Sequence, residues 1–320
     1  MKSVTKLSPY MNINRIEFIV TYHCSGKCIH CSVSDKLNQA NGYHHVRVAE
    51  AAQAIEWLAG HFPISSVMTF GGEPLLYPDV VCSIHKTASS CGIEAKQLIT
   101  NGYFSKDEKR IQEVANLLYD SGVNNLMLSV DAFHQETIPV EPVYKFAETI
   151  AQTGLSKIRL QPAWLVNPEH ENPYNKKTRE ILSVFQNLGI PVAKGNNIFL
   201  AGNAAKYLSN YYDAPNLNLS DTCGTLPYTE LLTNITSLSI VPNGDVMICS
   251  FVIGNIYQES IADIISRYDP YENDCMRAIV TGGASALIEL AAEKGISIDC
   301  STCYSICDLC HKINAQKDLA

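Results

Sequence analysis

The sequence predicts an α/β protein in which parallel strands alternate with helices, followed by a smaller cysteine-rich segment. Three observations support this prediction. Short apolar runs alternate with helical patterns over the first two thirds of the chain, glycines follow several of these patterns, and four of the twelve cysteines crowd near the C-terminus. A repeated strand–helix unit implies parallel strands joined by right-handed crossovers.

The strand candidates are short apolar runs at residues 16–20, 66–70, 94–100, 125–131 and 157–162, with a later one near 197–200. Between them, apolar residues recur at helical spacing in residues 46–60, 78–91, 106–121, 141–153 and 178–188. Ser105 is the expected N-cap of the third helix. Four glycines just past these helices are expected to terminate them, namely Gly92, Gly122, Gly154 and Gly189. About six strand–helix units fit, fewer than the eight of a complete barrel.

The chain changes character at about residue 206, so we expect two domains, residues 1–205 and 206–320. In the second, residues 236–241 and 246–249 are expected to form a β-hairpin with Asn243 and Gly244 at its turn. The downstream part combines a helical pattern with a cysteine-dense loop.

Bulk composition excludes several classes of function. The formal net charge is −8 with no run of Lys and Arg, so nucleic acid is not an expected partner. The longest apolar run, residues 284–292, is too short to span a bilayer, and residues 1–12 lack the apolar core of a signal peptide. We therefore expect a cytoplasmic protein with no membrane partner, in which clustered cysteines indicate metal binding more than disulfides.

Three cysteines, Cys24, Cys28 and Cys31, follow the first predicted strand with the spacing C-x3-C-x2-C. Three thiolates on one loop can hold three irons of a [4Fe–4S] cube and leave the fourth iron without a protein ligand. An iron with an open site can bind a substrate or cofactor. A zinc site and unrelated free thiols are the alternatives.

Polar residues and glycines follow the next three strands, where the carboxyl ends of parallel strands form the functional face of a barrel. The first group is Gly71, Gly72, Glu73 and Pro74, in which two glycines allow close approach of a ligand to the backbone. Asn101 follows the third strand, and Ser129 and Asp131 end the fourth. An ordinary turn and a helix cap are the alternatives for these residues, and His134 is expected at the surface.

The cysteine triplet and the G-G-E-P sequence together resemble the radical S-adenosylmethionine (SAM) superfamily. His30 occupies the position that is usually aromatic in that family. The resemblance implies a partial (β/α)6 TIM-like barrel whose cluster binds SAM through its open iron and cleaves it to a 5′-deoxyadenosyl radical. It further implies cofactor contacts from His30, Gly71, Gly72, Glu73, Pro74, Asn101, Ser129 and Asp131, and an electron donor such as flavodoxin or ferredoxin.

The C-terminal cysteines resemble the SPASM and Twitch extensions of this superfamily, which hold an auxiliary [4Fe–4S] cluster. The ligands expected from the resemblance are Cys223, Cys249, Cys307 and Cys310, with Cys303 or Cys300 as alternates. Two C-x2-C pairs separated by only three residues are too close for a zinc ribbon, which favours iron–sulfur over zinc.

The resemblance favours an enzyme that abstracts hydrogen from a peptide or protein, with epimerisation, crosslinking or oxidation as the outcome. Ribosomal-peptide epimerases are similar, but their hydrogen-donating cysteine corresponds to Ser250 here, which leaves Cys275, Cys300 and Cys303 as candidate donors. One alternative is a small-molecule dehydrogenase or cyclase of cofactor biosynthesis. Another is a non-catalytic iron–sulfur binding or sensing protein. The sequence does not identify the substrate.

Overall fold

The computed structural model describes residues 7–36, 42–224, 226 and 229–317. The chain divides into two compact units. The larger unit comprises Arg15–Tyr212 and Ile240–Gly244, and the smaller comprises Met1–Asn14, Asp213–Ser239 and Asp245–Ala320. Each unit is described by itself below.

Parallel strands form the centre of the larger unit, in the order β1-β2-β3-β4-β5. Their bounds are β1 Met11–Ile19, β2 Ser66–Phe70, β3 Ala95–Thr100, β4 Asn125–Ser129 and β5 Lys157–Gln161. A parallel bridge between Leu160 and Val192 extends the series beyond β5. The chain therefore has the predicted α/β fold, a partial barrel of parallel strands.

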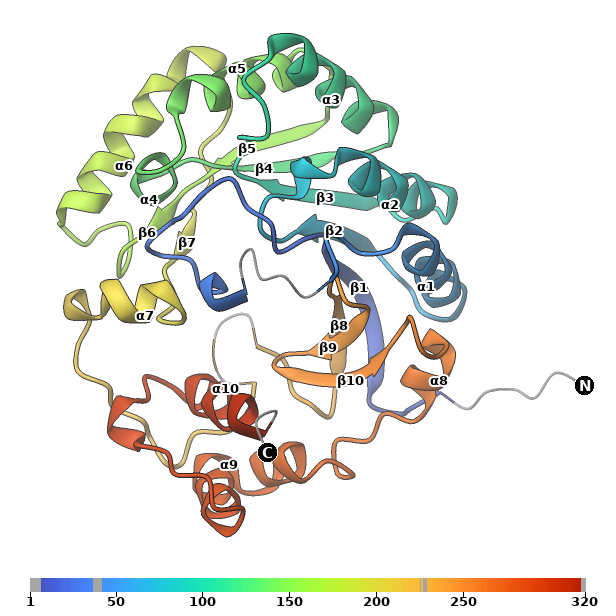
Figure 1. Cartoon of the computed structure of the whole chain (residues 1–320), viewed down its shortest axis with the longest axis vertical. Helices are drawn as coiled ribbons and strands as arrows, with labels where there is room; N and C mark the ends of the chain where they lie inside the picture. Colours follow the sequence, from blue (N-terminus) through green and yellow to red (C-terminus); the bar gives the residue numbers. More distant parts are fainter. Residues whose placement is uncertain (1–6, 37–41, 225, 227–228, 318–320) are drawn as a thin grey trace, which may run out of the picture. The chain divides into compact units, whose positions relative to one another are not determined.

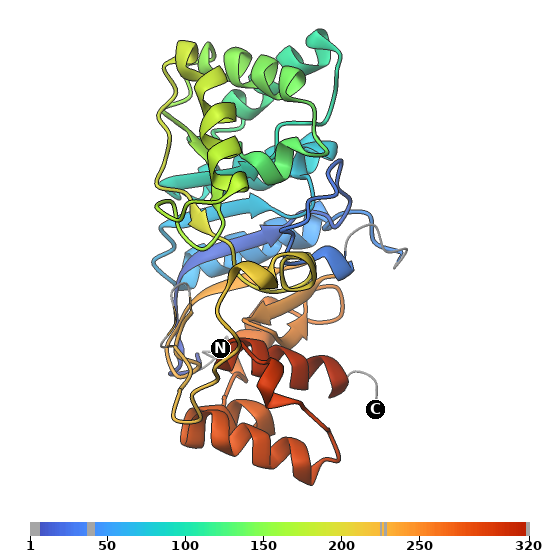
Figure 2. The same cartoon turned by 90° about the vertical axis from the view of Figure 1, so that its left-hand side faces the viewer.

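Helices cover the outside of these strands, as Figures 1 and 2 show. They are α1 Val48–His61, α2 Pro78–Ser90, α3 Glu108–Asp120, α4 Ala132–Gln135, α5 Val140–Ala151, α6 Pro173–Val184 and α7 Asn203–Tyr207. Two short strands, β6 Ala163–Trp164 and β7 Asn196–Asn197, pair in parallel. Short 3-10 turns occur at Ser34–Lys36, Pro74–Leu76, Gln186–Leu188, Ser209–Tyr211 and Cys300–Thr302.

The core lies between the outer face of the strands and the helices. Alternate strand residues such as Phe18, Leu98 and Leu126 are fully buried there. Residues on the apolar sides of helices are fully buried as well, for example Leu58 of α1 and Phe146 of α5. Burial of this layer fixes which side chains point the other way, toward the inside of the barrel.

Most predicted elements of the larger unit are confirmed, and three details are wrong. β1 begins at Met11 instead of residue 16, and α6 covers Pro173–Val184 instead of 178–188. The N-cap of α3 is Asp107, whose side chain accepts from the Lys109 N–H, whereas Ser105 Oγ accepts from the Asp107 N–H. The four predicted terminating glycines all have left-handed φ angles, between 64° and 86°.

Three more strands are β8 Ile235–Ile240, β9 Asp245–Ile248 and β10 Phe251–Asn255, which belong to the smaller unit except for Ile240. β9 and β10 pair antiparallel. The predicted turn at Asn243 and Gly244 is confirmed, with Gly244 N–H donating to the Val241 carbonyl and φ of 88° at Gly244. The third strand, β10, follows a tight turn in which Cys249 adopts a left-handed φ of 52°.

Three helices complete the smaller unit: α8 Ile261–Ser266, α9 Asp274–Glu293 and α10 Ile306–Lys317. Among the described residues, α9 is the one helix long and apolar enough to cross a membrane. Its path is broken at Gly283, where φ is 63°, and residues such as Met276 and Leu287 are buried within the protein. The similarity of α9 to a membrane span rests on length and composition alone.

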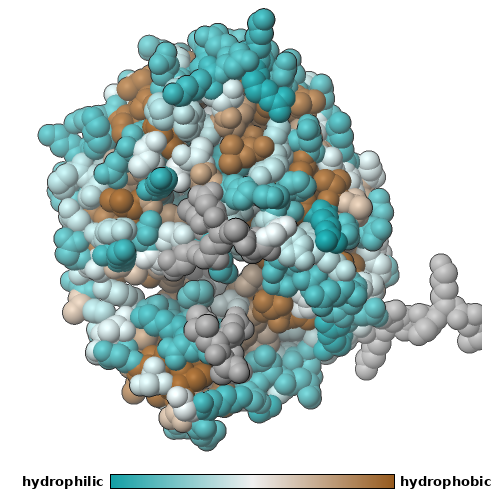
Figure 3. All heavy atoms as spheres, viewed as in Figure 1, coloured by the Kyte–Doolittle hydropathy of each residue, from teal (hydrophilic) through white to brown (hydrophobic). Residues whose placement is uncertain are grey.

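On the face drawn in Figure 3, hydrophobic residues lie in separate groups among hydrophilic ones.

Candidate functional site

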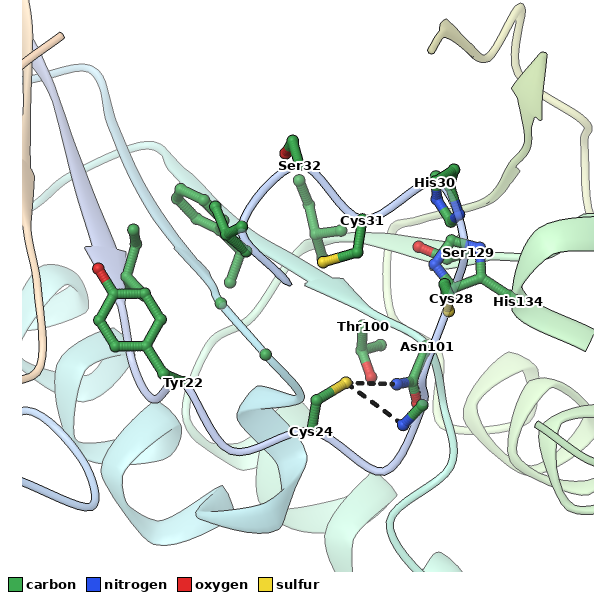
Figure 4. A pocket seen from close by; sticks show the side chains of 17 residues that line it. Tyr22, Cys24, Cys28, His30, Cys31, Ser32, Thr100, Asn101, Ser129 and His134 are labelled. Atoms are coloured by element: carbon green, nitrogen blue, oxygen red, sulfur yellow. Dashed lines mark hydrogen bonds between the residues drawn. The ribbon is translucent and has the colours of Figure 1, made fainter. Parts of the chain in front are cut away.

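The loop after β1 places the three cysteines of the C-x3-C-x2-C sequence around one cavity (Figure 4). The cavity has a volume of about 260 Å³, and Cys24, Cys28 and Cys31 all line it. A hydrogen bond from the Cys31 N–H to the Cys28 carbonyl, 3.2 Å long, holds the loop in a turn. Burial raises the pKa of Cys24 to about 11, so its thiol is protonated at neutral pH when no metal is bound.

Gly71 and Gly72 form one wall of this cavity, directly after β2. The Gly72 N–H donates to the Thr21 carbonyl, and the Glu73 N–H donates to the His23 carbonyl, both at 2.7 Å. A Cβ atom at Gly72 would overlap the His23 backbone. Glycine is required here because the loop of the cysteines lies directly against this segment.

Glu73 lies behind the wall and does not line the cavity. It is fully buried, and its carboxylate accepts hydrogen bonds from the Thr100 hydroxyl at 2.6 Å and from the N–H groups of Leu75 and Asn101 at 2.8 Å. Burial raises its pKa to about 7, although these hydrogen bonds act in the opposite direction. In the structure Glu73 therefore joins the ends of β2 and β3. Pro74 is also buried and begins a 3-10 turn.

Asn101 and Ser129 both line the cavity, at the ends of β3 and β4. The Asn101 side-chain amide donates toward Cys24 Sγ at 3.7 Å (Figure 4). It also donates toward Ser25 Oγ at 3.3 Å. Its side-chain oxygen accepts from the Tyr103 N–H at 2.8 Å. These contacts fix the amide against the cysteine loop.

His134 is the lining residue that sequence analysis placed elsewhere. Instead of lying at the surface, it is largely buried on the cavity wall, where its Nδ1 lies 2.8 Å from Asp131 Oδ2. Burial opposes charge on both groups, yet their pairing lowers the pKa of Asp131 to about 2 and raises that of His134. Asp131 itself is fully buried and also caps α4 through the Phe133 and His134 N–H groups.

The His30 ring packs against the His134 ring, with ring centroids 4.7 Å apart. Its ring also packs against Phe133 at 5.1 Å. Burial and the neighbouring His134 lower the pKa of His30 to about 4, so its ring is neutral at physiological pH. A neutral, packed ring at this position fits the aromatic character that the resemblance implies.

The donor set around the cavity fits a cluster that leaves one iron open. Among the described residues no three His, Cys, Asp or Glu side chains are grouped so as to hold a single metal ion. A four-iron cube carries its thiolate ligands at separate corners, so its ligands stand farther apart than those of one ion. Three thiols bordering one cavity, with glycines opposite, meet that requirement.

The four expected auxiliary ligands also gather in one place within the smaller unit. Burial raises the pKa of Cys310 to about 12, and the neighbouring thiols of Cys223, Cys307 and Cys249 act in the same direction. The alternates are placed differently. Cys303 is fully buried, near Cys300, with Lys312 Nζ 3.8 Å from its sulfur. This arrangement favours the first four cysteines as ligands over Cys300 and Cys303.

The candidate hydrogen donors differ in accessibility. Cys275 and Cys303 are buried, and Cys300 is half-buried. Ser250, at the position of the donor in epimerases, lies with its hydroxyl 3.8 Å from Cys310 Sγ.

Comparison with protein families matches residues 18–200 to the radical SAM superfamily. This match covers more than half of the chain, and the chain therefore belongs to the radical SAM superfamily. Residues 233–310 match the SPASM iron–sulfur cluster-binding domain. The protein is thus an enzyme that uses [4Fe–4S] clusters and SAM, as the sequence predicted, with an extension of the SPASM type.

Curated relatives are similar over part of the chain. A GTP 3′,8-cyclase of Desulforamulus reducens is 26% identical over 126 residues, which is 39% of this chain and 37% of the relative. A GTP 3′,8-cyclase of Picosynechococcus is 34% identical over 94 residues, 29% of this chain and 24% of the relative. The chain spans well under two thirds of the length of the curated relatives that it matches.

Among solved structures, BtrN in complex with AdoMet and 2-DOIA is 18% identical, with a TM-score of 0.48 over 86% of this chain and 91% of that one. A structure of anSMEcpe with bound AdoMet is 15% identical, with a TM-score of 0.47 over 84% of this chain and 80% of that one.

Proposed function

We propose that the chain binds its SAM-cleaving cluster through Cys24, Cys28 and Cys31 and abstracts hydrogen from a small polar molecule. The observation that carries the cluster assignment is the single cavity shared by these three thiols, Gly71 and Gly72. When bound, the cluster supplies the electron that cleaves SAM. The protein's own groups hold the cofactor beside it: the glycine backbone forms one wall, and Asn101 and Ser129 supply polar contacts.

The small-molecule substrate is supported by the relatives. Several of the curated relatives are named GTP 3′,8-cyclases, and another is a molybdenum cofactor biosynthesis protein of Caenorhabditis elegans. These names agree with the alternative of a dehydrogenase or cyclase in cofactor biosynthesis. They give no support to a peptide substrate, which stays a prediction from the resemblance alone.

The cluster assignment is tested by anaerobic reconstitution, followed by measurement of 5′-deoxyadenosine formed from SAM and reductant. Cys24→Ala, Cys28→Ala and Cys31→Ala are each expected to abolish product and to lower iron content. Cys91→Ala is the matched control, because this half-buried cysteine at the end of α2 is remote from the cavity lining. Product from any of the three variants at the wild-type rate would reject the assignment.

The auxiliary ligands are tested by iron counting on the same preparation. Cys307→Ala is expected to remove one cluster and leave SAM cleavage measurable, whereas Cys300→Ala is expected to retain both clusters. The reverse result would transfer the ligand role to Cys300.

To test the substrate class, a cell extract is dialysed, and the small molecules that pass the membrane and the macromolecules that are retained are added separately to the reconstituted protein. Stimulation of 5′-deoxyadenosine formation by the dialysable fraction is expected. Stimulation by the retained macromolecules or by a co-encoded peptide would instead establish the peptide alternative.

A further inference from the structure

A second hollow, of about 500 Å³, lies beside the first half of β5. One side of it is formed by the last residue of α5 and residues 155–159, and the other side by residues 188–191. The two segments join just beyond the hollow, where the Leu160 N–H donates to the Pro191 carbonyl and accepts at its own carbonyl from the Ala193 N–H, both at 2.9 Å. The hollow is therefore the space left where the two segments diverge.

This hollow and the cavity of the three cysteines lie at opposite ends of β5. Lys157 and Arg159 border the hollow and belong to the first half of the strand. Gln161, the last residue of β5, pairs in register with the cavity-lining Ser129. None of the described residues that line the hollow also lines the cavity. In barrels of parallel strands the reaction takes place at the carboxyl ends, so a molecule in this hollow is distinct from the substrate.

Most of the residues around the hollow are apolar. They are Ala151, Leu155, Ile158, Leu188, Ile190 and Pro191. A volume of this size, with mainly apolar walls and a few polar groups, is typical of sites that bind small organic molecules. Because contact with such walls removes apolar surface from water, they favour a ligand with an aliphatic or aromatic part.

Two cations border these apolar walls, and neither is neutralised by the protein. In the part of the chain that the structure describes, no ion pair involves Lys157 or Arg159, although the formal net charge is −8. Arg159 donates instead to two neutral amides, from Nη1 to Asn125 Oδ1 at 2.5 Å and from Nε to Gln161 Oε1 at 3.4 Å. Its Nη2 donates to none of the described groups.

This arrangement leaves hydrogen-bond donors for an anion. A half-buried guanidinium without a counter-ion loses hydration and gains no ionic partner in return, and its planar donors suit a carboxylate or a phosphate. The backbone adds a further donor. Alternate residues of a strand direct their N–H groups to the same side, so the Ile158 N–H points to the side on which Leu160 pairs with residues 191 and 193.

We propose that this hollow is a second ligand site, which binds a small organic anion with an apolar body. The carboxylate or phosphate of the ligand accepts hydrogen bonds from Arg159 and from the Ile158 N–H, close to the charge of Lys157. Its aliphatic or aromatic part lies against Leu188 and Ile190. The site does not depend on the proposed cleavage of SAM, because it is separate from the cavity in which the cluster is expected.

The test measures the binding of four probes to the reconstituted protein by calorimetry. Octanoate and phenyl phosphate combine an anion with an apolar body, whereas acetate and inorganic phosphate carry the anion alone. At least one of the first two is expected to bind about tenfold or more tightly than its smaller counterpart, because it buries apolar surface. Preference for octanoate would assign the head group as a carboxylate, and preference for phenyl phosphate as a phosphate.

Variants test the two parts of the site separately. Arg159→Gln is expected to weaken binding about tenfold with unchanged iron content, and Arg159→Lys to restore part of the affinity. Ile190→Ser is expected to weaken the probe with the apolar body more than its smaller counterpart. Arg110→Gln is the matched control, because Arg110 is exposed on α3 and paired with Glu113.

Saturating SAM is expected to leave the affinity of the probe unchanged. Competition with SAM would place the probe in the cavity of the three cysteines and would overturn the proposal. Binding of neither octanoate nor phenyl phosphate more tightly than its counterpart, or equal weakening by Arg110→Gln, would overturn it as well. No step of this measurement requires 5′-deoxyadenosine, so its result is independent of the proposed function.

Discussion

Replacement of Gly72 by alanine tests how the cysteine loop is held in position. Gly72 lies against the backbone of residues that lead into Cys24, and an added Cβ would lie 2.7 Å from the His23 carbonyl carbon and 3.0 Å from that of Tyr22. Carbon atoms in proteins pack at about 3.5–4.0 Å. Because both neighbours are backbone atoms, they cannot rotate away, and the loop must shift.

The cost follows from the contacts that the shift disrupts. Two hydrogen bonds cross this junction, from Gly72 to Thr21 and from Glu73 to His23, and each is worth about 0.5–1.5 kcal/mol. Steric repacking adds about 1–3 kcal/mol. A domain is stable by about 5–15 kcal/mol, so most molecules are expected to remain folded with a displaced cysteine loop.

We expect Gly72→Ala to lose one cluster equivalent of iron and its 5′-deoxyadenosine formation, and to keep the auxiliary cluster. Gly60→Ala is the matched control: Gly60 is in α1 with no atom within 4 Å of its added Cβ, and alanine there should stabilise the helix by about 0.5–1 kcal/mol. Wild-type iron content and activity in Gly72→Ala would refute the argument that glycine is required.

Three further predictions concern polar groups around the cavity. Asn101→Ala removes the amide beside Cys24 and is expected to slow 5′-deoxyadenosine formation about tenfold with full iron content; an unchanged rate would show that the amide is dispensable. His134→Leu leaves the buried Asp131 carboxylate without its charged partner, so urea denaturation should show a loss of about 3–5 kcal/mol in the free energy of unfolding. Exposed ion pairs contribute up to about 1 kcal/mol, so a smaller loss than this would contradict a buried ion pair. Glu73 has a folded-state pKa of about 7, above its value of 4.5 in an unfolded chain, so the folded protein binds this proton more tightly. The protonated Glu73 carboxyl therefore adds to the free energy of unfolding at low pH, and this contribution is lost as pH rises from 4.5 through 7. In cluster-free protein, Glu73→Gln should make the free energy of unfolding depend less on pH over this range.

The strands could be predicted where successive residues of an apolar run are buried on both faces of the sheet. β2 was located to the residue because each of its first four positions is buried. β1 was only half predicted because Asn12 and Asn14 interrupt its apolar pattern at the start. The start of α6 was missed although Asn172 and Pro173 form a recognisable cap and first-turn pair.

The candidate site divides along similar lines. Cysteine spacing and the glycine pair carry their chemistry in local sequence, so the residues could be named before their positions were known. The pairing of His134 with Asp131 is local, three residues apart on α4 and its cap, but the burial of His134 also depends on His30 of the cysteine loop, which no local pattern brings beside it.

Some strand residues that alternate with the buried core positions are polar, which has a consequence for folding stability. Residues such as Gln97, Asn125 and Arg159 occupy positions where Val or Leu would bury more apolar surface. Natural proteins are rarely at their stability optimum, and such positions are where stabilising substitutions are commonly found. Apolar substitutions at these positions should therefore raise the denaturation midpoint. The polar residues of the barrel strands therefore leave the fold less stable than its topology allows.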